Sequence, residues 1–474
     1  MISSFKYTNR SWTVFPLILL LFSCATYNTQ ISKYYELMAS ENYVNAFASL
    51  DNIKRLKTGR NRLLYLFEKG KMAHHMGLYD SSNLYFNEAD LFMEDVRTST
   101  EDIIVGNLLN PMMEKYKGED FERFMVHYYK ALNYLYLGNI EDALVEARRI
   151  TLQSYRQQDK TSSKENHYSN DAFSLILQGI IYEKDNDVNN AFISYRNAAD
   201  IFLKNKNSYF GVALPEQLQQ DVLRTAMQNG FSDQVIRYEK LFNTTYKIRQ
   251  PGSGGELVLI WENGLAPIKV QQDFFFMLNK DAGGSFFFTD AVGLYNIPFD
   301  FSSYEDREKL SAANLRSLRV AFPRYQEQPL YFQNAVLNIG GKQYAFEVAE
   351  DINTLAPAIL QHRFLKEMSK TLTRIAVKKI AEEAARPKTD AKNKDEKEAL
   401  ALTVQIFNFL SEKADTRNWQ SLPRTIFYSR IPLEKGENVM TLDLAATNGN
   451  PGKQVIINAE GRGELEVRNV STIR

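Results

Sequence analysis

The feature that most constrains the fold is a helix-pair pattern that recurs through the first half of the 474-residue chain. In the clearest copy, Gly179 and Tyr182 fall on one helix, and Ala191, Tyr195 and Ala198 fall on the next. A helix pair cannot bury its apolar face alone, so neighbouring pairs stack into a continuous layer. Related patterns occupy residues 43–53, 70–89, 138–144 and 215–242. The sequence therefore predicts an all-α solenoid over residues 31–245.

These pairs resemble tetratricopeptide (TPR) repeats, in which small residues let two helices approach and large apolar residues fill the groove between neighbours. A regular array has a period of about 34 residues. Here the intervals between equivalent small positions are 36, 61 and 48 residues, counted over Ala46, Ser82, Ala143 and Ala191. Two insertions, at residues 95–120 and 151–170, account for the excess. Such insertions usually lie on one face, often the binding face.

The second half of the chain predicts strands. The segment PGSGG at 251–255 ends the helical pattern and is interpreted as a linker, because it precedes a strand, whereas a phosphate-binding loop follows one. Beyond it, short apolar runs bounded by turn residues predict strands, and Gly340-Gly341 predicts a hairpin turn. The expected strands are residues 256–261, 274–278, 285–289, 318–322, 335–339 and 344–348, then 425–432 paired with 439–444 and 454–458 paired with 464–468.

Helical spacing returns between these strands. A long helix is expected over residues 357–386, followed by a charged linker at 386–397 and a second helix at 398–413. One face of the long helix is apolar, through Leu365, Met368, Leu372, Ile375, Ala376 and Ile380. The sequence thus predicts an α+β multidomain protein, in which a TPR-like solenoid precedes a β-rich domain. That domain comprises residues 256–350 and 414–474, with a helical hairpin inserted at 351–413.

The N-terminus predicts an export signal with a lipid-attachment site. Residues 1–13 contain Lys6 and Arg10 and no acid, and the apolar run Val14–Phe22 follows. Nine residues of helix rise only about 14 Å, which is too short to cross a bilayer. The segment Leu21-Phe22-Ser23-Cys24 resembles the bacterial lipobox, and Cys24 is the only cysteine in the chain. The alternative is an ordinary signal peptide beside a free cysteine.

Exported proteins avoid unpaired thiols, so Cys24 is interpreted as an acylation site, with residues 1–23 removed and residues 24–30 acting as a tether. The lipobox resemblance implies several acyl chains, palmitate among them, and more than one chain is needed for stable anchoring. Ala25 in place of an aspartate implies transfer to the outer membrane. Residues 25–30 contain no acidic cluster, which favours the periplasmic face. No other segment of the sequence approaches 18 apolar residues, so no further membrane span is expected.

Charge and composition give no support for nucleic-acid binding, metal chemistry or catalysis. The chain has 57 basic and 57 acidic residues, and removing residues 1–23 leaves the mature form two charges negative. No histidine has the spacing of a metal site, and no G-x-S-x-G elbow or free thiol nucleophile is present. The histidines are His74, His75, His127, His167 and His362. We therefore expect no enzyme and no cofactor. The alternative that stays open is an enzyme acting on envelope glycans or lipids through the β-rich domain.

Two pairs of residues are candidates for partner binding. Arg148 and Arg149 are expected near the end of a repeat helix, either compensating the helix dipole or meeting an anionic group of a partner. Arg417 and Trp419 precede a strand in DTRNWQSLP. They are either a buried plug at a domain junction or an arginine–aromatic anchor of the kind found in binding hot spots.

A basic stripe on the helix at 357–386 is a third candidate. Its members recur every three or four residues, opposite the apolar face: Arg363, Lys366, Lys370, Arg374 and Lys378. Glu367 interrupts the stripe and can pair with Arg363. The stripe is either a plain solvated face or a contact with anionic headgroups or an acidic partner.

Several segments together resemble a largely uncharacterised family of bacterial lipoproteins with TPR-like repeats. They are residues 116–149, 215–230, 255–269, 319–325 and 414–433. Members are often encoded near lipoproteins related to the curli-secretion pore and to activators of cell-wall synthases, which implies a role in envelope assembly or export. The expected function is a lipid-anchored periplasmic scaffold that binds envelope proteins, including other lipoproteins.

Overall fold

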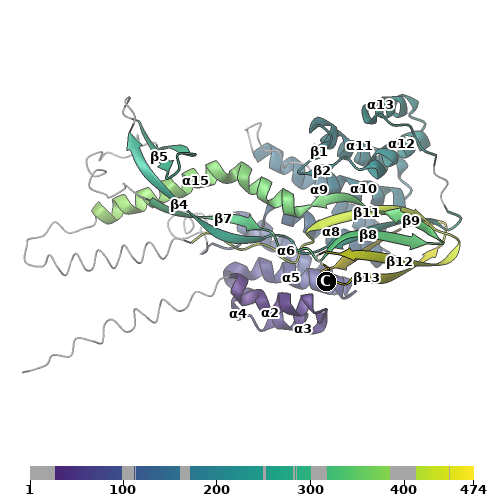
Figure 1. Cartoon of the computed structure of the whole chain (residues 1–474), viewed down its shortest axis with the longest axis horizontal. Coiled ribbons are helices and arrows are strands. Elements are labelled where there is room, and N and C mark those ends of the chain that lie inside the picture. Colours follow the sequence, from purple (N-terminus) through teal and green to yellow (C-terminus); the bar gives the residue numbers. More distant parts are fainter. Residues whose placement is uncertain are drawn as a thin grey trace, which may run out of the picture.

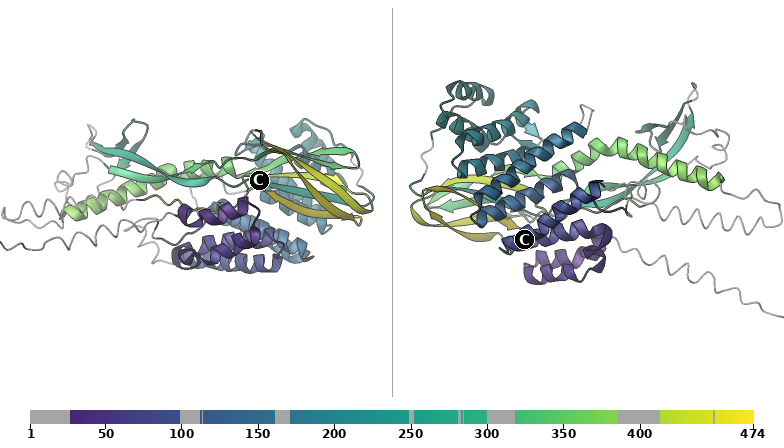
Figure 2. Two further views of the ribbon diagram at one scale, coloured as in Figure 1. Left: turned by 60° about the horizontal axis from the view of Figure 1, so that its bottom comes forward. Right: turned by 180° about the vertical axis from the view of Figure 1, so that it is seen from behind.

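The computed structural model describes residues 27–98, 112, 114–160, 171–248, 252–280, 283, 285–299, 318–384, 413–447 and 449–474. It consists of a helical layer packed along one face of a β-sandwich, and of a lobe of sheet and helix that extends beyond both (Figures 1 and 2). Cys24, the linker at 386–397 and nearly all of the expected helix at 398–413 lie outside the described residues.

The helical layer contains five consecutive helix pairs within the described residues, as the sequence predicts. A short helix α4 (Lys54–Lys57) and a 3₁₀ turn follow the first pair, and a small hairpin of β1 (Ser208–Tyr209) and β2 (Val212–Ala213) precedes the last. The pairs are α2 (Tyr27–Ala39) with α3 (Tyr43–Asp51), α5 (Arg62–His75) with α6 (Tyr79–Thr98), α8 (Asp120–Tyr136) with α9 (Ile140–Lys160), α10 (Ala172–Lys184) with α11 (Val188–Lys204), and α12 (Glu216–Gln228) with α13 (Ser232–Phe242).

Small residues on the first helix of a pair receive aromatic rings from the second. A Cβ added to Gly70 would lie 2.6 Å from the ring of Phe86, and one added to Gly179 would lie 2.5 Å from the ring of Tyr195. Both rings are fully buried. This complementarity confirms the packing that the repeat pattern predicts.

Three four-stranded sheets follow the helices. The inner sheet has the order β10-β11-β3-β14 and the outer sheet the order β13-β12-β8-β9. The lobe sheet has the order β6-β5-β4-β7. Their bounds are β3 (Gly255–Asn263), β4 (Ile268–Lys280), β5 (Phe286–Asp290), β6 (Asn296–Phe299), β7 (Leu318–Gln326), β8 (Phe332–Ile339), β9 (Lys342–Ala345), β10 (Glu347–Asp351), β11 (Thr425–Pro432), β12 (Gly436–Ala446), β13 (Lys453–Gly461) and β14 (Glu464–Thr472).

Most of the predicted strands are present, but β6 was not expected, and the single strand expected at 344–348 is divided between β9 and β10. The pairing expected for the last four strands is wrong. β11 pairs with β3 and β10, and β12 pairs with β8 and β13. β14 runs parallel to β3, more than 200 residues earlier in the chain. The reason is that β3 is buried on both faces and occupies a central position, so it needs a partner on each edge. The expected hairpin at Gly340-Gly341 is confirmed, since both residues have positive φ and join antiparallel β8 and β9.

The glycine segment before β3 is not a free linker. A Cβ on Gly252 would lie 2.0 Å from the carbonyl oxygen of Leu433, and one on Gly255 would lie 2.1 Å from that of Glu464. The glycines therefore allow three backbone segments to cross in direct contact.

The two faces of β3 belong to different cores. Leu257, Leu259 and Trp261 pack against the outer sheet and fill the sandwich. Val258 and Ile260 point the other way, into the core formed by the helices. The helical layer and the inner sheet therefore share one continuous core, although a sequence boundary separates them at residues 245–256.

The lobe has a core of its own. The long helix α15 (Ile352–Ala384) packs Met368, Leu372, Ile375 and Ala376 against the lobe sheet. It begins five residues before the predicted start, where the backbone N–H of Ile352 donates to the carbonyl of Arg424. Leu365 was expected on the buried face but is 58% exposed, because the neighbouring Phe364 takes the inward position. Among the helices that the structure describes, none is both long and apolar enough to span a bilayer.

Candidate functional site

The first helices of the pairs face the inner sheet, and we call the surface formed by α5, α8, α10 and α12 the inner face. Polar groups join it to the sheet. The hydroxyl groups of Tyr128 and Tyr129 donate to the buried carboxylate of Glu262 on β3, at 2.9 and 3.0 Å. Lys184 donates to the carbonyl of Leu465 on β14 at 2.8 Å. The surface that repeat proteins commonly use for partners is thus occupied by the chain's own sheet.

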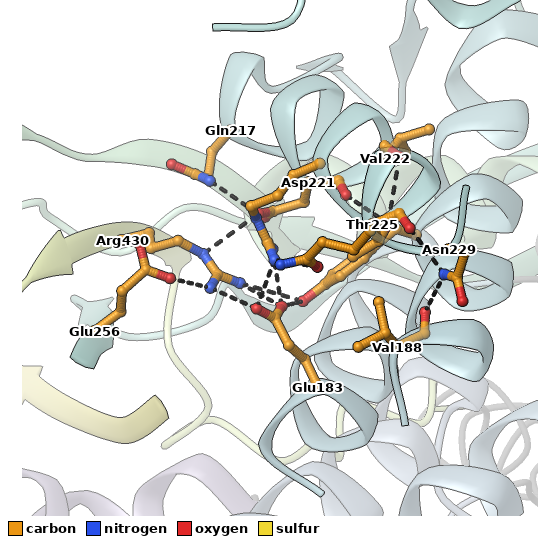
Figure 3. Close-up of polar contacts among 12 residues, drawn as sticks. Glu183, Val188, Gln217, Asp221, Val222, Thr225, Asn229, Glu256 and Arg430 are labelled. Carbon is orange, nitrogen blue, oxygen red and sulfur yellow. Dashed lines mark hydrogen bonds and ion pairs between the residues drawn. The ribbon is translucent and has the colours of Figure 1, made fainter. Parts of the chain in front are cut away.

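A buried ionic cluster strengthens this contact (Figure 3). The guanidinium group of Arg430, on β11, forms ion pairs with Glu183 of α10 and Glu256 of β3, both at 2.8 Å, and with Asp221 of α12 at 3.3 Å. Arg224 of α12 also pairs with Glu183 at 2.7 Å and with Asp221 at 2.8 Å. Burial by itself would raise the pKa of Glu183, but the two guanidinium groups lower it to about 2. Glu183 is therefore held in its charged form at the contact between the helical layer and the sheet, whereas burial raises the pKa of Asp221.

Arg417 and Trp419 form the buried plug and not an exposed anchor, since they are 1% and 0% exposed. Arg417 pairs with Asp415 at 2.7 Å and donates to the carbonyl of Glu114 at 3.0 Å. The Trp419 ring stacks on Phe67 at 4.5 Å. Neither side chain is accessible to a partner in this structure. Arg417 lies against Arg60, Asn61 and Glu114, and helices α5, α6 and α8 contribute the rings around Trp419.

The plug also holds a carboxyl group with an unusual protonation equilibrium. The backbone N–H of Trp419 donates to Glu122 at 2.6 Å, and the Tyr116 hydroxyl donates to the other oxygen, also at 2.6 Å. Burial, and then repulsion from Glu119, raises the pKa of Glu122 to about 7. Glu119 itself is ion-paired with Lys269 and Arg363, which lower its pKa against the effect of burial.

Arg148 and Arg149 are exposed, but they do not lie at a helix end, because α9 continues to Lys160. The prediction of dipole compensation is therefore wrong. Arg148 donates to the hydroxyl of Tyr182 at 3.0 Å, and Arg149 pairs with Asp90 of α6 at 3.4 Å. Both contacts lie within the helical layer.

A cluster of Asp90, His127 and Glu146 lies beside Arg149, with ligand atoms within 4.8 Å of one another. Such a group can hold a metal ion. Here the buried ammonium group of Lys130 lies 2.7 Å from Asp90 and 2.9 Å from Glu146. A lysine already supplies the positive charge that these carboxylates need, so the cluster does not fit a metal site.

The basic stripe on α15 is divided by its contacts. Arg363 pairs with Glu119 at 2.6 Å and with Glu367 at 3.5 Å, so it ties the helix to α8. Lys366 and Lys370 are exposed, and Arg374 is partly buried. The side chain of Lys378 lies outside the described residues. Two lysines of the predicted stripe are therefore open to an anionic surface.

The outer face of the second helices carries exposed apolar side chains. On α6, Leu84 and Leu91 are 71% and 68% exposed, and they lie on one side of the helix, two turns apart. On the neighbouring α9, Val145 is 43% exposed. The ion pair between Arg149 and Asp90 links these two helices at one point. This surface, defined by Leu84, Leu91, Val145 and the two arginines, is called the outer patch.

A cavity of about 750 Å³ opens between the lobe sheet and α15, and we call it the lobe pocket. One wall is formed by Phe364, whose ring lies 4.9 Å from the rings of Tyr295 and Phe322 and 5.5 Å from that of Phe274. Its rim is exposed and apolar, and includes Val292, Leu294 and Leu365. Only the apolar residues in the turn at 291–294 signal this site in the sequence, because its walls come from four separate segments of the chain.

The two carboxylates that line the lobe pocket are engaged in structural contacts. Asp273 accepts two hydrogen bonds from Arg319 at 3.0 Å. Asp290 is buried and accepts from the backbone N–H of Tyr295 at 2.7 Å, which shapes the turn between β5 and β6. No pair of carboxylates converges in this pocket in the manner of a glycosidase.

Comparisons with known proteins add little. No family model matches the chain, and no curated protein matches its sequence. Among solved structures, it is similar to a Podosopora anserina chain named after kinesin light chain, with nearly identical TPR-like repeats. That similarity has 15% identity and a TM-score of 0.27, and covers 46% of this chain and 91% of the other. A variant of the same protein aligns at 14% identity and the same TM-score. A TM-score this low carries no argument about function.

Proposed function

We propose that the protein is a lipid-anchored scaffold of the bacterial envelope that holds a protein partner on the outer patch. The observation that carries this proposal is the closure of the inner face by the chain's own sheet. A partner then has to bind elsewhere on the helical layer. The outer patch offers exposed leucines flanked by arginines, a combination of apolar and basic side chains that suits an interface centre with a polar rim.

The anchor belongs to the same proposal. Cys24, after a short apolar run, would hold the protein at the periplasmic face of the outer membrane, beside other lipoproteins and envelope proteins. Replacement of Cys24 by serine should leave an unlipidated protein that partitions into the aqueous phase after detergent extraction. Incorporation of labelled fatty acid into that variant would contradict the assignment of the anchor.

The partner surface is tested by affinity capture after mild cross-linking in intact cells. A chain with Leu84→Glu and Leu91→Glu should lose the envelope proteins that the parent chain captures. The matched control is Ile456→Glu, because Ile456 is 71% exposed on β13 of the outer sheet, away from the outer patch. If parent, control and Leu84/Leu91 variant capture the same proteins equally, the outer patch is not the binding surface.

A further inference from the structure

The lobe pocket combines an apolar interior with a basic rim. We propose that it binds one long acyl chain ending in an anionic headgroup, as an exchangeable ligand. This site is separate from the outer patch and does not depend on the proposed protein partner.

The interior suits an acyl chain in shape and chemistry. Four aromatic side chains, Phe274, Tyr295, Phe322 and Phe364, surround the pocket, and Leu360 of α15 also lines it. A volume of about 750 Å³ falls within the range of about 300–1,000 Å³ that small-molecule sites occupy. Aromatic and aliphatic walls favour methylene groups over a charged or strongly polar ligand.

The entrance suits insertion from a lipid phase. Val292 and Leu294 are 77% and 76% exposed, although they lie in a short turn where polar residues are usual. Leu365 faces them from α15 and is also exposed. Apolar side chains exposed to water carry a cost in free energy, and contact with an acyl chain would reduce that cost.

The charges at the rim select an anionic end. Arg324 lines the pocket, is exposed, and forms no ion pair with another described residue. Lys366 and Lys370 follow Leu365 on α15 and are exposed, although they do not line the pocket themselves. Two nearby acids are paired, Asp273 with Arg319 and Glu367 with Arg363. The third, Asp290, is buried and accepts hydrogen bonds from the backbone N–H groups of Val292 and Tyr295. Among the described residues, the exposed charge that lines the entrance without a paired acid is therefore that of Arg324.

The test measures displacement of a fluorescent fatty acid, dansylaminoundecanoate, from the purified chain carrying Cys24→Ser. We expect one site per chain. The affinity should rise by about fourfold for each methylene added from octanoate upward, and level off once the acyl chain fills the pocket. Leu294→Glu and Phe364→Ala should weaken palmitate binding, while Ile456→Glu on the outer sheet should leave it unchanged.

Arg324→Gln separates headgroup recognition from apolar burial. It should weaken palmitate by about threefold to fivefold and leave the uncharged hexadecanol unaffected, because only the anion pairs with a guanidinium group. Circular dichroism spectra identical to the parent's would show that each variant is folded.

Three results would overturn the inference. The first is unsaturable probe binding or none, and the second is equal binding by the lobe and outer-sheet variants. In the third, the lipid-bearing parent chain binds markedly less probe than the Cys24→Ser chain, so that the protein's own acyl group fills the pocket in place of an exchangeable ligand.

Discussion

Arg430 illustrates how a single side chain holds the helical layer and the inner sheet together. It is 2% exposed and balances three carboxylates from two helices and a strand. A buried charge needs a counter-ion because it has lost its hydration. Removing one partner therefore destabilises the fold by more than the intact ion pair stabilises it.

Replacing Arg430 by alanine should therefore destabilise the protein by about 3–5 kcal/mol, because Glu183, Asp221 and Glu256 lose a buried counter-ion. Urea denaturation monitored by circular dichroism would measure the change. Arg462→Ala is the control, since the pair of Arg462 with Glu460 is exposed and should contribute little. Similar midpoints for the two variants would show that the cluster does not carry the contact.

The lowered pKa of Glu183 makes the same contact sensitive to acid. The pKa falls from an ordinary value of 4.5 to about 2 in the folded protein, so the folded state binds fewer protons than the unfolded state between these values. The stabilisation is complete above about pH 5 and is lost as the pH falls toward 2. The parent should have a higher free energy of unfolding than Glu183→Gln. This difference should be larger at pH 6 than at pH 2, by about 3 kcal/mol. A difference that does not change with pH would exclude this linkage.

At the scale of the elements, the close packing of a helix pair depends on a glycine, which has no side chain. Gly70 lets α5 approach α6 so closely that the ring of Phe86 occupies the space of a Cβ. The gain in helix propensity from an alanine there is smaller than the cost of displacing a buried ring in a close-packed core.

Gly70→Ala should therefore destabilise the protein by about 1–3 kcal/mol, despite the better helix propensity of alanine. Phe86→Leu should lower stability as well, by leaving a cavity. The double variant should be more stable than the sum of the two losses predicts. Leucine in place of Phe86 is smaller than the ring and leaves room for the methyl group that alanine adds in place of Gly70. Additive losses in a double-mutant cycle would mean that the two residues do not compete for the same space.

At the scale of the whole molecule, the shared core makes the helical layer depend on the sandwich. The first helices bury polar side chains such as Lys71, His74, Tyr128 and Tyr129 against the inner sheet. Without the sheet these groups and the apolar residues beside them would face water.

A fragment comprising residues 27–248 should therefore keep helical circular dichroism but lose cooperative unfolding and bind a hydrophobic dye. The full chain should unfold the helical layer and the inner sheet in one transition. A sharp transition of the isolated fragment, with a native near-ultraviolet spectrum, would show that the helical layer is an independent domain.

The sequence by itself determined the elements whose signals are local. The small and large residues of a helix pair both lie within that pair. The strand predicted at residues 425–432 forms β11 with the same bounds. Gly340-Gly341 specified its turn because glycine adopts positive φ angles at no steric cost, and both residues need them.

Only the tertiary structure decided which elements meet. Any of several equally apolar strands could pair with β3, and the choice of β14 depends on the packing of the whole sandwich. For Arg417 and Trp419 the sequence left open a buried plug or an exposed anchor, and only the packing around them decided for the plug. Arg430 meets Glu183 across 247 residues, and the walls of the lobe pocket come from four segments. Such contacts depend on the free energy of the whole fold, which no window of neighbouring residues contains.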